Sequence, residues 1–561
     1  MDGISGTAYG LASLVWQEDA DAYVARNAPG TPFPDLTALY QDDEHILGLM
    51  PTCAARAAAV VDTGPRVGGF SKEAKWLCVV RDAEEIVEAK AWFGPFGLPD
   101  SAYLPYDNGG EILGGAFGPA DVREERVRRD LAKQSRKNEA IARLDHRHAA
   151  FACLVSTGTS CVANHAARTA AVHPSTFAEY DAHTLALVSD VTGIERTRLN
   201  DAVLASRPRD GGMGVRPAAP YADAAFVASM LESEHLQRRL APSLPPVRED
   251  AEFIAAWQRL RDGYPTLEEA SLSPSSQVAD RVTKLQRRLS EPITAKRLEQ
   301  RDALVPSVSA RARLRSAGAC ASWQVPHPTA ADRPGDVWLY NRTFLWAMAL
   351  RVGGSVQDGD HPCHLCRGAS VADAAGVHTL GCVGGGARTR MHTALKNDIF
   401  TLAARATLAP RLEPGVGTEG RRADVALYLP PRGTEASTLL LDVATTSPLA
   451  DPRRAAETPG GAADHYAERK LASYRGVEIP HGARVLPVVR DMLGAFGRDA
   501  RVVLRRIIQR TAELSGESYA RQSARTWGWL QVRFWRELSV LLALNACSLD
   551  DSEAPLVPRR A

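Results

Sequence analysis

Four potential metal ligands within twenty residues constrain the fold of this chain more than any other feature. They form two short pairs, Cys363-His-Leu-Cys366 and His378-Thr-Leu-Gly-Cys382, separated by eleven residues. Both pairs are short enough for the four side chains to surround one ion. Three thiolates and one imidazole in a closed tetrahedron are typical of structural zinc. The segment is therefore predicted to fold around a zinc ion.

Two details of this segment bear on the prediction. Glycines between the ligands would allow the tight backbone that the site needs: Gly368, Gly376 and Gly381. Other histidines lie close enough in sequence to replace His378: His361, His364 and His392. The alternative interpretation is a chance grouping of thiols that bind no metal.

The composition excludes several classes of protein. Hydrophobic residues make up 45% of the 561 residues and charged residues 24%, which excludes a wholly disordered chain. Nine cysteines are too few for a disulfide scaffold in a chain of this length. The length itself suggests three or four domains of roughly 150 residues. No apolar run approaches the roughly 20 residues of a membrane span, and the N-terminus lacks a secretory pattern. We expect neither a membrane protein nor a secreted one.

Positive charge is concentrated in two segments, although the net charge of the whole chain is only +1. Arg123–Arg147 contains nine basic against five acidic residues, and Arg281–Arg315 contains ten against three. Such segments are typical of phosphate contacts, although solvated helix faces also show them. The candidate nucleic-acid contacts are Arg128, Arg129, Arg287 and Arg288.

Two aspartates follow the cysteine cluster on successive apolar runs. Asp424 precedes Val-Ala-Leu-Tyr-Leu, and Asp442 ends Thr438-Leu-Leu-Leu-Asp442. The Pro430–Gly433 turn lets the two runs pair as an antiparallel hairpin, which would bring the carboxylates together. Two carboxylates at one sheet edge do not both ionise cheaply unless a divalent cation lies between them. Asp at a strand end is also ordinary turn chemistry, so the pattern alone is weak.

A helical pattern downstream places Lys470 and Tyr474 four residues apart on one face. Two acids that hold Mg²⁺, with a lysine near the scissile phosphate, are what metal-assisted phosphodiester cleavage needs. Near the N-terminus, Tyr40-Gln-Asp42-Asp43 places two adjacent acids in a predicted β-hairpin. Adjacent acids at a hairpin tip can bind the cations used by polymerases, although Asp-Asp is also a common turn.

The order of these features resembles the C-terminal portion of reverse transcriptases from non-LTR retrotransposons that end in a restriction-like endonuclease. Tyr40–Asp43 is similar to the family's Tyr-x-Asp-Asp box, and Lys75 resembles the lysine that follows it in the palm. Further resemblances, in chain order, are the loop and helix at Gly6–Val24, the primer-grip hairpin at Glu111–Gly118, the thumb-end segment Asp210–Arg216, connector segments Ala317–Trp323 and Tyr340–Trp346, and Arg390-Met-His392 after the zinc cluster.

The resemblance implies a multidomain fold of α/β and helical parts. Its expected domains are a partial reverse transcriptase palm (1–120), a helical thumb (121–240), a basic helical connector (241–355), a zinc module (356–394), a restriction-like endonuclease (395–515) and a C-terminal helix and tail (516–561). Target DNA and element RNA are the implied partners, with structural Zn²⁺, catalytic Mg²⁺ and no small-molecule substrate apart from nucleotides. Location in the nucleus is expected only because the implied substrate is DNA.

The endonuclease of that family has a PD-(D/E)xK fold. The resemblance implies that Asp424 is its first acid and Asp442 its second. The in-strand lysine is missing, because Ala444 occupies its position. The resemblance then implies that Lys470 replaces it from the following helix, beside Tyr474. Two glutamates are open candidates for an upstream acid: Glu413 and Glu419.

The polymerase part departs from the family pattern. Only 39 residues precede Tyr40, and they do not include the strand with the family's other metal-binding aspartate. We therefore interpret the chain as N-terminally truncated and expect that it does not polymerise DNA alone, even with Asp42 and Asp43 present.

Two function classes compete. The first is a Mg²⁺-dependent DNA endonuclease, favoured because Asp424, Asp442 and Lys470 are all retained. The second is a non-catalytic, zinc-containing nucleic-acid-binding relic of such an element. A metabolic α/β enzyme is disfavoured, because Gly384-Gly-Gly386 has no strand–loop–helix frame of the phosphate-binding kind.

Overall fold

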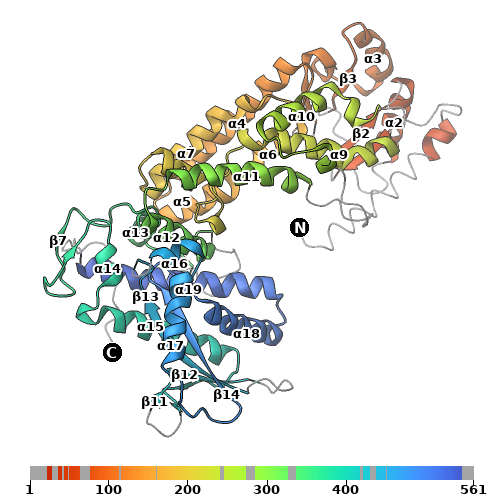
Figure 1. The fold of residues 1–561 in the computed structure, drawn as a ribbon. Coiled ribbons are helices and arrows are strands. Elements are labelled where there is room, and N and C mark those ends of the chain that lie inside the picture. The colour runs from red at the N-terminus through yellow and green to blue at the C-terminus, as the bar shows by residue number, and fades with distance from the viewer. Residues whose placement is uncertain are drawn as a thin grey trace. The chain divides into compact units, whose positions relative to one another are not determined.

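The computed structural model describes a mixed α/β protein in which helices predominate and the sheets are small (Figure 1). It describes residues 22–27, 36–40, 43–47, 50–63, 76–112, 115–158, 161–240, 245–272, 285–325, 337–416, 421–429, 437–449 and 452–545. None of the helices in these ranges is both long and apolar enough to cross a membrane. Asp42, Lys75 and Glu419 lie outside the described residues.

Two compact units make up the chain. Unit 1 comprises residues 1–132, 162–178 and 218–293, and unit 2 comprises 133–161, 179–217 and 294–561. The predicted thumb and connector ranges are each divided between them. Two long helices continue from one unit into the other: α4 (Ala120–Ala142) and α11 (Leu285–Leu304).

Unit 1 contains short hairpins and a helical group. Strands β1 (Leu36–Tyr40) and β2 (Asp43–Leu47) pair antiparallel, with Tyr40 opposite Asp43 as the sequence pattern predicted. Strands β5 (Gly110–Ile112) and β6 (Gly115–Phe117) form the second predicted hairpin. The parallel pair is β3 (Cys78–Val80) with β4 (Tyr103–Pro105). The helices are α2 (Met50–Thr63), α3 (Glu85–Phe93), α6 (Cys161–Thr169), α9 (Ala222–Leu240) and α10 (Ala251–Gly263).

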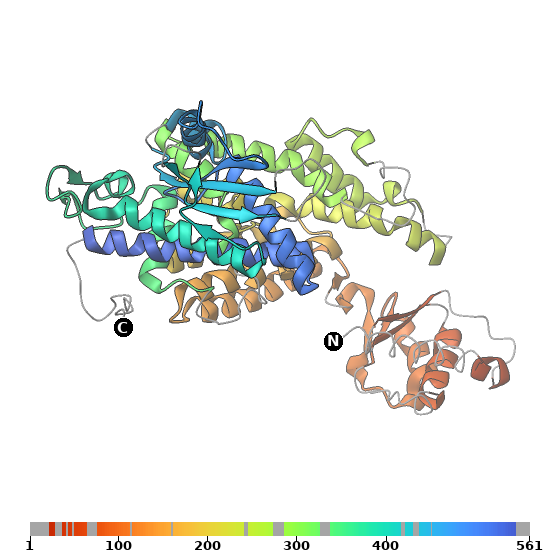
Figure 2. The same cartoon turned by 90° about the horizontal axis from the view of Figure 1, so that it is seen from below.

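Unit 2 is built on a four-stranded sheet with the order β14-β13-β12-β9. Figure 2 shows this sheet in cyan and blue among its covering helices. Its strands are β9 (Arg411–Leu412), β12 (Val425–Tyr428), β13 (Thr438–Thr446) and β14 (Ala483–Asp491). β12 pairs antiparallel with both β9 and β13, whereas β14 runs parallel to β13. The parallel connection passes through α16 (Pro452–Glu457) and α17 (Gly461–Ala472).

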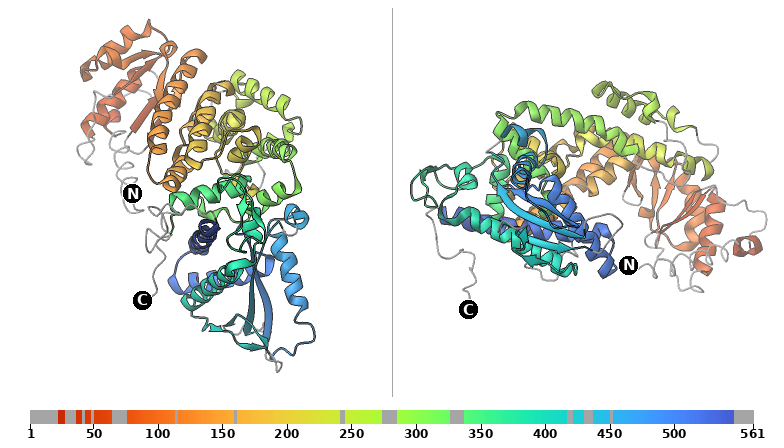
Figure 3. Two further views of the ribbon diagram at one scale, coloured as in Figure 1. Left: turned by 90° about the vertical axis from the view of Figure 1, so that its left-hand side faces the viewer. Right: turned by 60° about the horizontal axis from the view of Figure 1, so that its bottom comes forward.

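Alternation along the strands explains the layers around this sheet. In β13, Leu439, Leu441 and Val443 share a core with α15 (Ala387–Arg405) and α18 (Arg498–Ser515). The residues between them face the other way, and Ala444 packs against α17. The left view of Figure 3 shows α15 and α17 on opposite sides of the strands. The order along the chain is therefore helix, strands, helices, strand and helix.

Helices and small hairpins complete unit 2. Its other helices are α5 (Arg147–Cys153), α7 (Ala178–Thr192), α8 (Arg198–Ala205), α12 (Val308–Gly318), α13 (Asn341–Val352), α14 (Val377–Gly381) and α19 (Tyr519–Asn545). The hairpins are β7 (His361–Pro362) with β8 (Val371–Ala372), and β10 (Gly415–Val416) with β11 (Arg421–Arg422). α19 confirms the predicted last helix, and its Trp535 and Leu538 join the largest core.

The middle of the segment Asp210–Arg216, Gly211–Met213, is buried in unit 2 and needs its glycines for close packing. Arg301 donates to the carbonyl of Asp210 at 2.7 Å, and Arg351 donates to that of Gly212 at 3.1 Å. A Cβ on Gly212 would lie 2.1 Å from the carbonyl oxygen of Ser206. No side chain fits there without moving the backbone.

Gly212→Ala is therefore expected to destabilise the protein by about 2 kcal/mol or more, because the added methyl group overlaps backbone atoms. Chemical denaturation of the full chain measures this change. Gly415→Ala is the matched control, because nothing lies within 4 Å of its Cβ position. Equal stability of the two variants would contradict the packing described.

Candidate metal centre and carboxylate site

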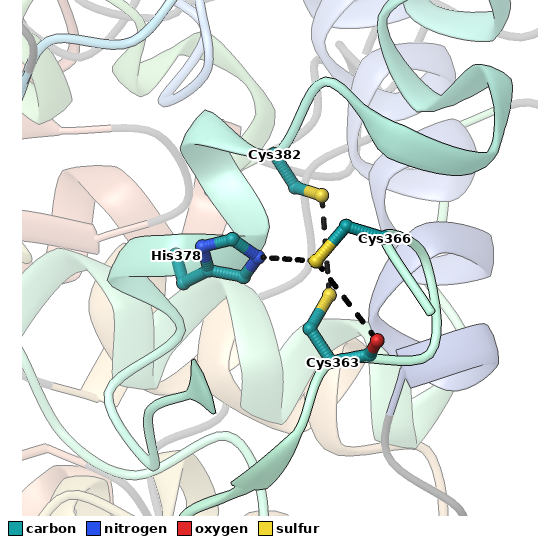
Figure 4. Close-up of side chains that lie close together, drawn as sticks. All are labelled: Cys363, Cys366, His378 and Cys382. Atoms are coloured by element: carbon teal, nitrogen blue, oxygen red, sulfur yellow. Dashed lines mark hydrogen bonds between the residues drawn. The ribbon is translucent and has the colours of Figure 1, made fainter. Parts of the chain in front are cut away.

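The four predicted ligands Cys363, Cys366, His378 and Cys382 lie together in unit 2 (Figure 4). Their ligand atoms are all within 4.8 Å of one another. The Sγ atoms of Cys363 and Cys382 are 3.9 Å apart, and Cys366 Sγ lies 3.6 Å from His378 Nε2. Ligand atoms around a tetrahedral zinc ion are spaced by about 3.8 Å for two sulfurs and about 3.6 Å for sulfur and nitrogen. The cluster could hold one metal ion and is compatible with zinc.

Local backbone geometry forms this cluster. Gly368 and Gly376 adopt φ angles of +80° and +69°, as a tight turn requires. The expectation for Gly381 is wrong: it lies in α14 with nothing near its Cβ position. Gly384 has the packing role instead, since a Cβ there would lie 2.5 Å from the Cα of Cys366.

Two side chains outside the ligand set hold the cluster in place. The carboxylate of Asp373 accepts hydrogen bonds from the backbone N–H groups of Val377 and His378, at 2.9 and 2.7 Å. The fully buried Asn545, at the end of α19, accepts from the N–H of His364 and donates to Thr379, at 3.0 and 2.6 Å. Asn545 therefore joins the first ligand pair to the second. Sequence analysis missed it, because in the sequence it only interrupts an apolar run.

Burial and neighbouring Cys363 together raise the pKa of the Cys382 thiol to about 11 in the metal-free protein, although the hydrogen bond from the N–H of Gly384 lowers it. Only the thiolate is a strong metal ligand, so metal binding must release this proton.

The predicted acids Asp424 and Asp442 come from neighbouring segments of this sheet: Asp424 directly precedes β12, and Asp442 lies in β13. The pairing of the two strands ends at Val425, opposite Leu441. The N–H of Asp424 also donates to the carbonyl of Leu441, at 2.9 Å, so the regular ladder does not continue to a pairing of Asp424 with Asp442. The Asp424 carboxylate instead accepts from the N–H of Val443, the residue after Asp442, which places the two acids close together.

Side chains from two helices surround the acids. Lys470 of α17 lies 2.7 Å from Asp442, in an ion pair that is largely shielded from solvent. Tyr474 lies two residues beyond the end of α17, where the sequence pattern predicted helix, and hydrogen-bonds to Asp442. Burial and the charge of Asp442 raise the pKa of this phenol to about 12, so it is protonated at neutral pH and acts as the donor. The lysine and tyrosine predicted for this site therefore both contact Asp442.

His392 contacts the carboxylate site and not the cysteine cluster. Its Nε2 lies 3.2 Å from Asp424, whose other carboxylate oxygen accepts from the N–H of Val443 at 2.7 Å. Burial alone would raise the pKa of Asp424, but His392, the Val443 amide and the charge of Lys470 together lower it. His392 thus helps to keep Asp424 ionised.

Other predicted residues lie elsewhere. The backbone N–H of Glu413 donates to the carbonyl of Asp424 at 3.0 Å, but its carboxylate pairs with Lys396 at 3.0 Å. Arg128 pairs with Glu124 at 2.7 Å, and Arg129 is exposed on the same helix. Arg287 lies 3.5 Å from Glu291.

The remaining candidates are only partly described. Arg288 donates to the carbonyl of Ser271, which engages part of its guanidinium group. For Asp43 the structure gives the strand position only. The chain matches no protein-family model, and no curated protein sequence matches it either.

The lowered pKa of Asp424 has a consequence for stability at acid pH. An ionised carboxylate with a lowered folded-state pKa stabilises the fold above its ordinary pKa of about 3.9. This stabilisation is lost as the pH falls through the lower folded-state value. His392→Ala removes a partner of the carboxylate, so the folded-state pKa of Asp424 should rise.

Melting temperatures of wild type and His392→Ala, measured between about pH 6 and pH 3, test this expectation. The difference between the two proteins should shrink towards the acid end. In an Asp424→Asn background, the same substitution should produce no such pH dependence. A difference that stays constant across the range would show that Asp424 and His392 are not coupled.

Proposed function

We propose that this protein is a nucleic-acid-binding endonuclease of the retrotransposon type, which nicks DNA with Mg²⁺ at Asp424 and Asp442. The observation that supports this most strongly is the meeting of four side chains from distant parts of the sequence. Asp424 and Asp442, a lysine and a tyrosine lie together, although only their chemistry suggested in advance that they would.

The donor set fits a magnesium ion. Magnesium is usually bound through one or two carboxylates, while substrate phosphates and waters complete its shell. Asp424 and Asp442 would supply those carboxylates. When bound, the ion would polarise the scissile phosphate and lower the pKa of the attacking water.

Protein side chains supply the other functions of the proposed site. The Lys470 ammonium, next to Asp442, is suited to stabilise negative charge that develops on phosphate oxygens. Tyr474 fixes the orientation of Asp442 through its hydrogen bond. His392 keeps Asp424 in the ionised form that binds a cation.

The cysteine cluster is proposed to hold structural zinc. All four ligands come from the protein, so no position is left for a water or a substrate. The exposed basic residues of α4 and α11 are proposed to contact nucleic-acid phosphates. Nuclear residence is proposed from the DNA substrate.

Metal content tests the zinc assignment. The purified full chain is expected to contain about one zinc per molecule, because one closed set of four ligands is present. Cys382→Ser should lose most of it and melt at a lower temperature, since binding of a structural metal contributes to folding. Cys161→Ser is the control, because that cysteine is exposed and lies outside the cluster. Full zinc content in the Cys382 variant would refute the assignment.

Nicking of supercoiled plasmid by the full chain tests the proposed activity. Mg²⁺-dependent nicking should fall about 100-fold or more in Asp442→Asn and Asp424→Asn, because the cation site loses a charged ligand. Asp190→Asn, at an exposed position on α7, is a matched control and should nick at the wild-type rate. If the folded, zinc-loaded wild type binds DNA but does not nick it, the protein is the non-catalytic nucleic-acid-binding alternative.

A further inference from the structure

Helix α18 has two chemically distinct faces. Its buried residues are aliphatic or small: Ala500, Val503, Leu504, Ile507, Ile508 and Ala512. The rest of the helix surface contains five arginines and no lysine, of which the first and third are exposed and the others partly buried. We call these residues the α18 arginine face: Arg498, Arg501, Arg505, Arg506 and Arg510. The first and last arginines are twelve residues apart, so the face is about 18 Å long.

Acidic groups within the helix neutralise little of this charge. The helix has two acids, Asp499 and Glu513, and Glu513 lies 3.4 Å from Arg510. Arg501 donates to the carbonyl of Pro459 at 3.4 Å, which is a contact with a neutral group. Asp464, at the start of α17, accepts from the backbone N–H of Arg498, whose side chain is exposed. The face therefore keeps an excess of positive charge.

The spacing of the arginines works against the stability of the helix. Arg498 and Arg501, Arg501 and Arg505, and Arg506 and Arg510 are like-charged pairs at three- or four-residue spacing, which destabilises a helix. The first two arginines also lie in the first turn, where the helix dipole disfavours cations. A bound polyanion would remove both costs. Five guanidinium groups, which can bind phosphate through two parallel hydrogen bonds, favour phosphate as that anion.

We infer that the α18 arginine face binds the phosphate backbone of double-stranded DNA. This inference rests on the proposed function, which supplies the polyanion. A length of about 18 Å matches about five phosphates of one strand, at about 3.4 Å of helix axis each. The face is separate from the carboxylate site, because α18 begins beside the first turn of α17, whereas Lys470 lies in the last turn of that helix. It would be a second DNA-binding surface, separate from the proposed site of cleavage.

Binding of a fluorescein-labelled 30-base-pair duplex of arbitrary sequence tests the inference, with the full chain and without Mg²⁺. In the double variant Arg498→Gln with Arg505→Gln, the Kd is expected to rise about tenfold at low salt. The slope of log Kd against log salt concentration should fall by about 2, because two phosphate contacts are lost. The matched control is Arg198→Gln with Arg484→Gln, which removes the same charge from exposed positions in the same unit.

Three outcomes separate this inference from the proposed activity. If the α18 variant binds less tightly than the control while no protein nicks plasmid, the DNA surface stands and the nuclease proposal fails. If the α18 variant and the control bind alike while the wild type nicks, the surface assignment is wrong and the nuclease proposal stands. If polyglutamate binds to wild type as tightly as the duplex, and the α18 variant loses both equally, the face fits an acidic protein and the DNA assignment is overturned.

Discussion

Two neighbouring acids at the sheet of unit 2 are the constraint on which this part of the protein depends. Asp424, directly before β12, and Asp442, in β13, are like charges that lie close together, an arrangement that is destabilising unless other groups compensate it. Three groups compensate it: Lys470 of α17, His392 of α15 and the backbone amide of Val443, the next residue of β13. Apolar residues of β12 and β13 fix the register that brings the acids together. The sheet thus holds the acids in place, and the neighbouring groups reduce their repulsion.

The metal cluster depends on its neighbours in a comparable way. Two ligand pairs that are distant from one another in sequence need a common support, and Asn545 supplies it by bonding to both sides. Because Asn545 ends α19, the last helix of the described chain contributes directly to the metal centre. The core that contains Cys363 and Cys382 also contains Trp535 and Leu538 of α19. If the cluster holds a metal ion, its removal is therefore expected to disturb the packing of this helix.

Local patterns predicted those features whose causes are local. The ligand spacing predicted the cysteine–histidine cluster, and the apolar runs predicted β12, β13 and the approach of Asp424 to Asp442. Lys470 lies in α17 as predicted, but this helix ends at Ala472, so Tyr474 lies beyond it and not on the same helical face. Only the connection through α17 brings both side chains to Asp442. His392 was considered as a metal ligand, because sequence distance links it to the cysteines. Its contact with Asp424 and the role of Asn545 depend on tertiary packing, for which the sequence contains no local signal.

The central claim is that Asp424 and Asp442 together form a divalent-cation site. Binding of Mn²⁺ to the zinc-loaded full chain, followed by electron paramagnetic resonance, tests it without requiring catalysis. The account predicts saturable binding of Mn²⁺ that Mg²⁺ displaces and that Asp442→Asn abolishes, while the zinc content is unchanged. Equal binding by wild type and Asp442→Asn, or no binding by a folded wild type, would contradict it.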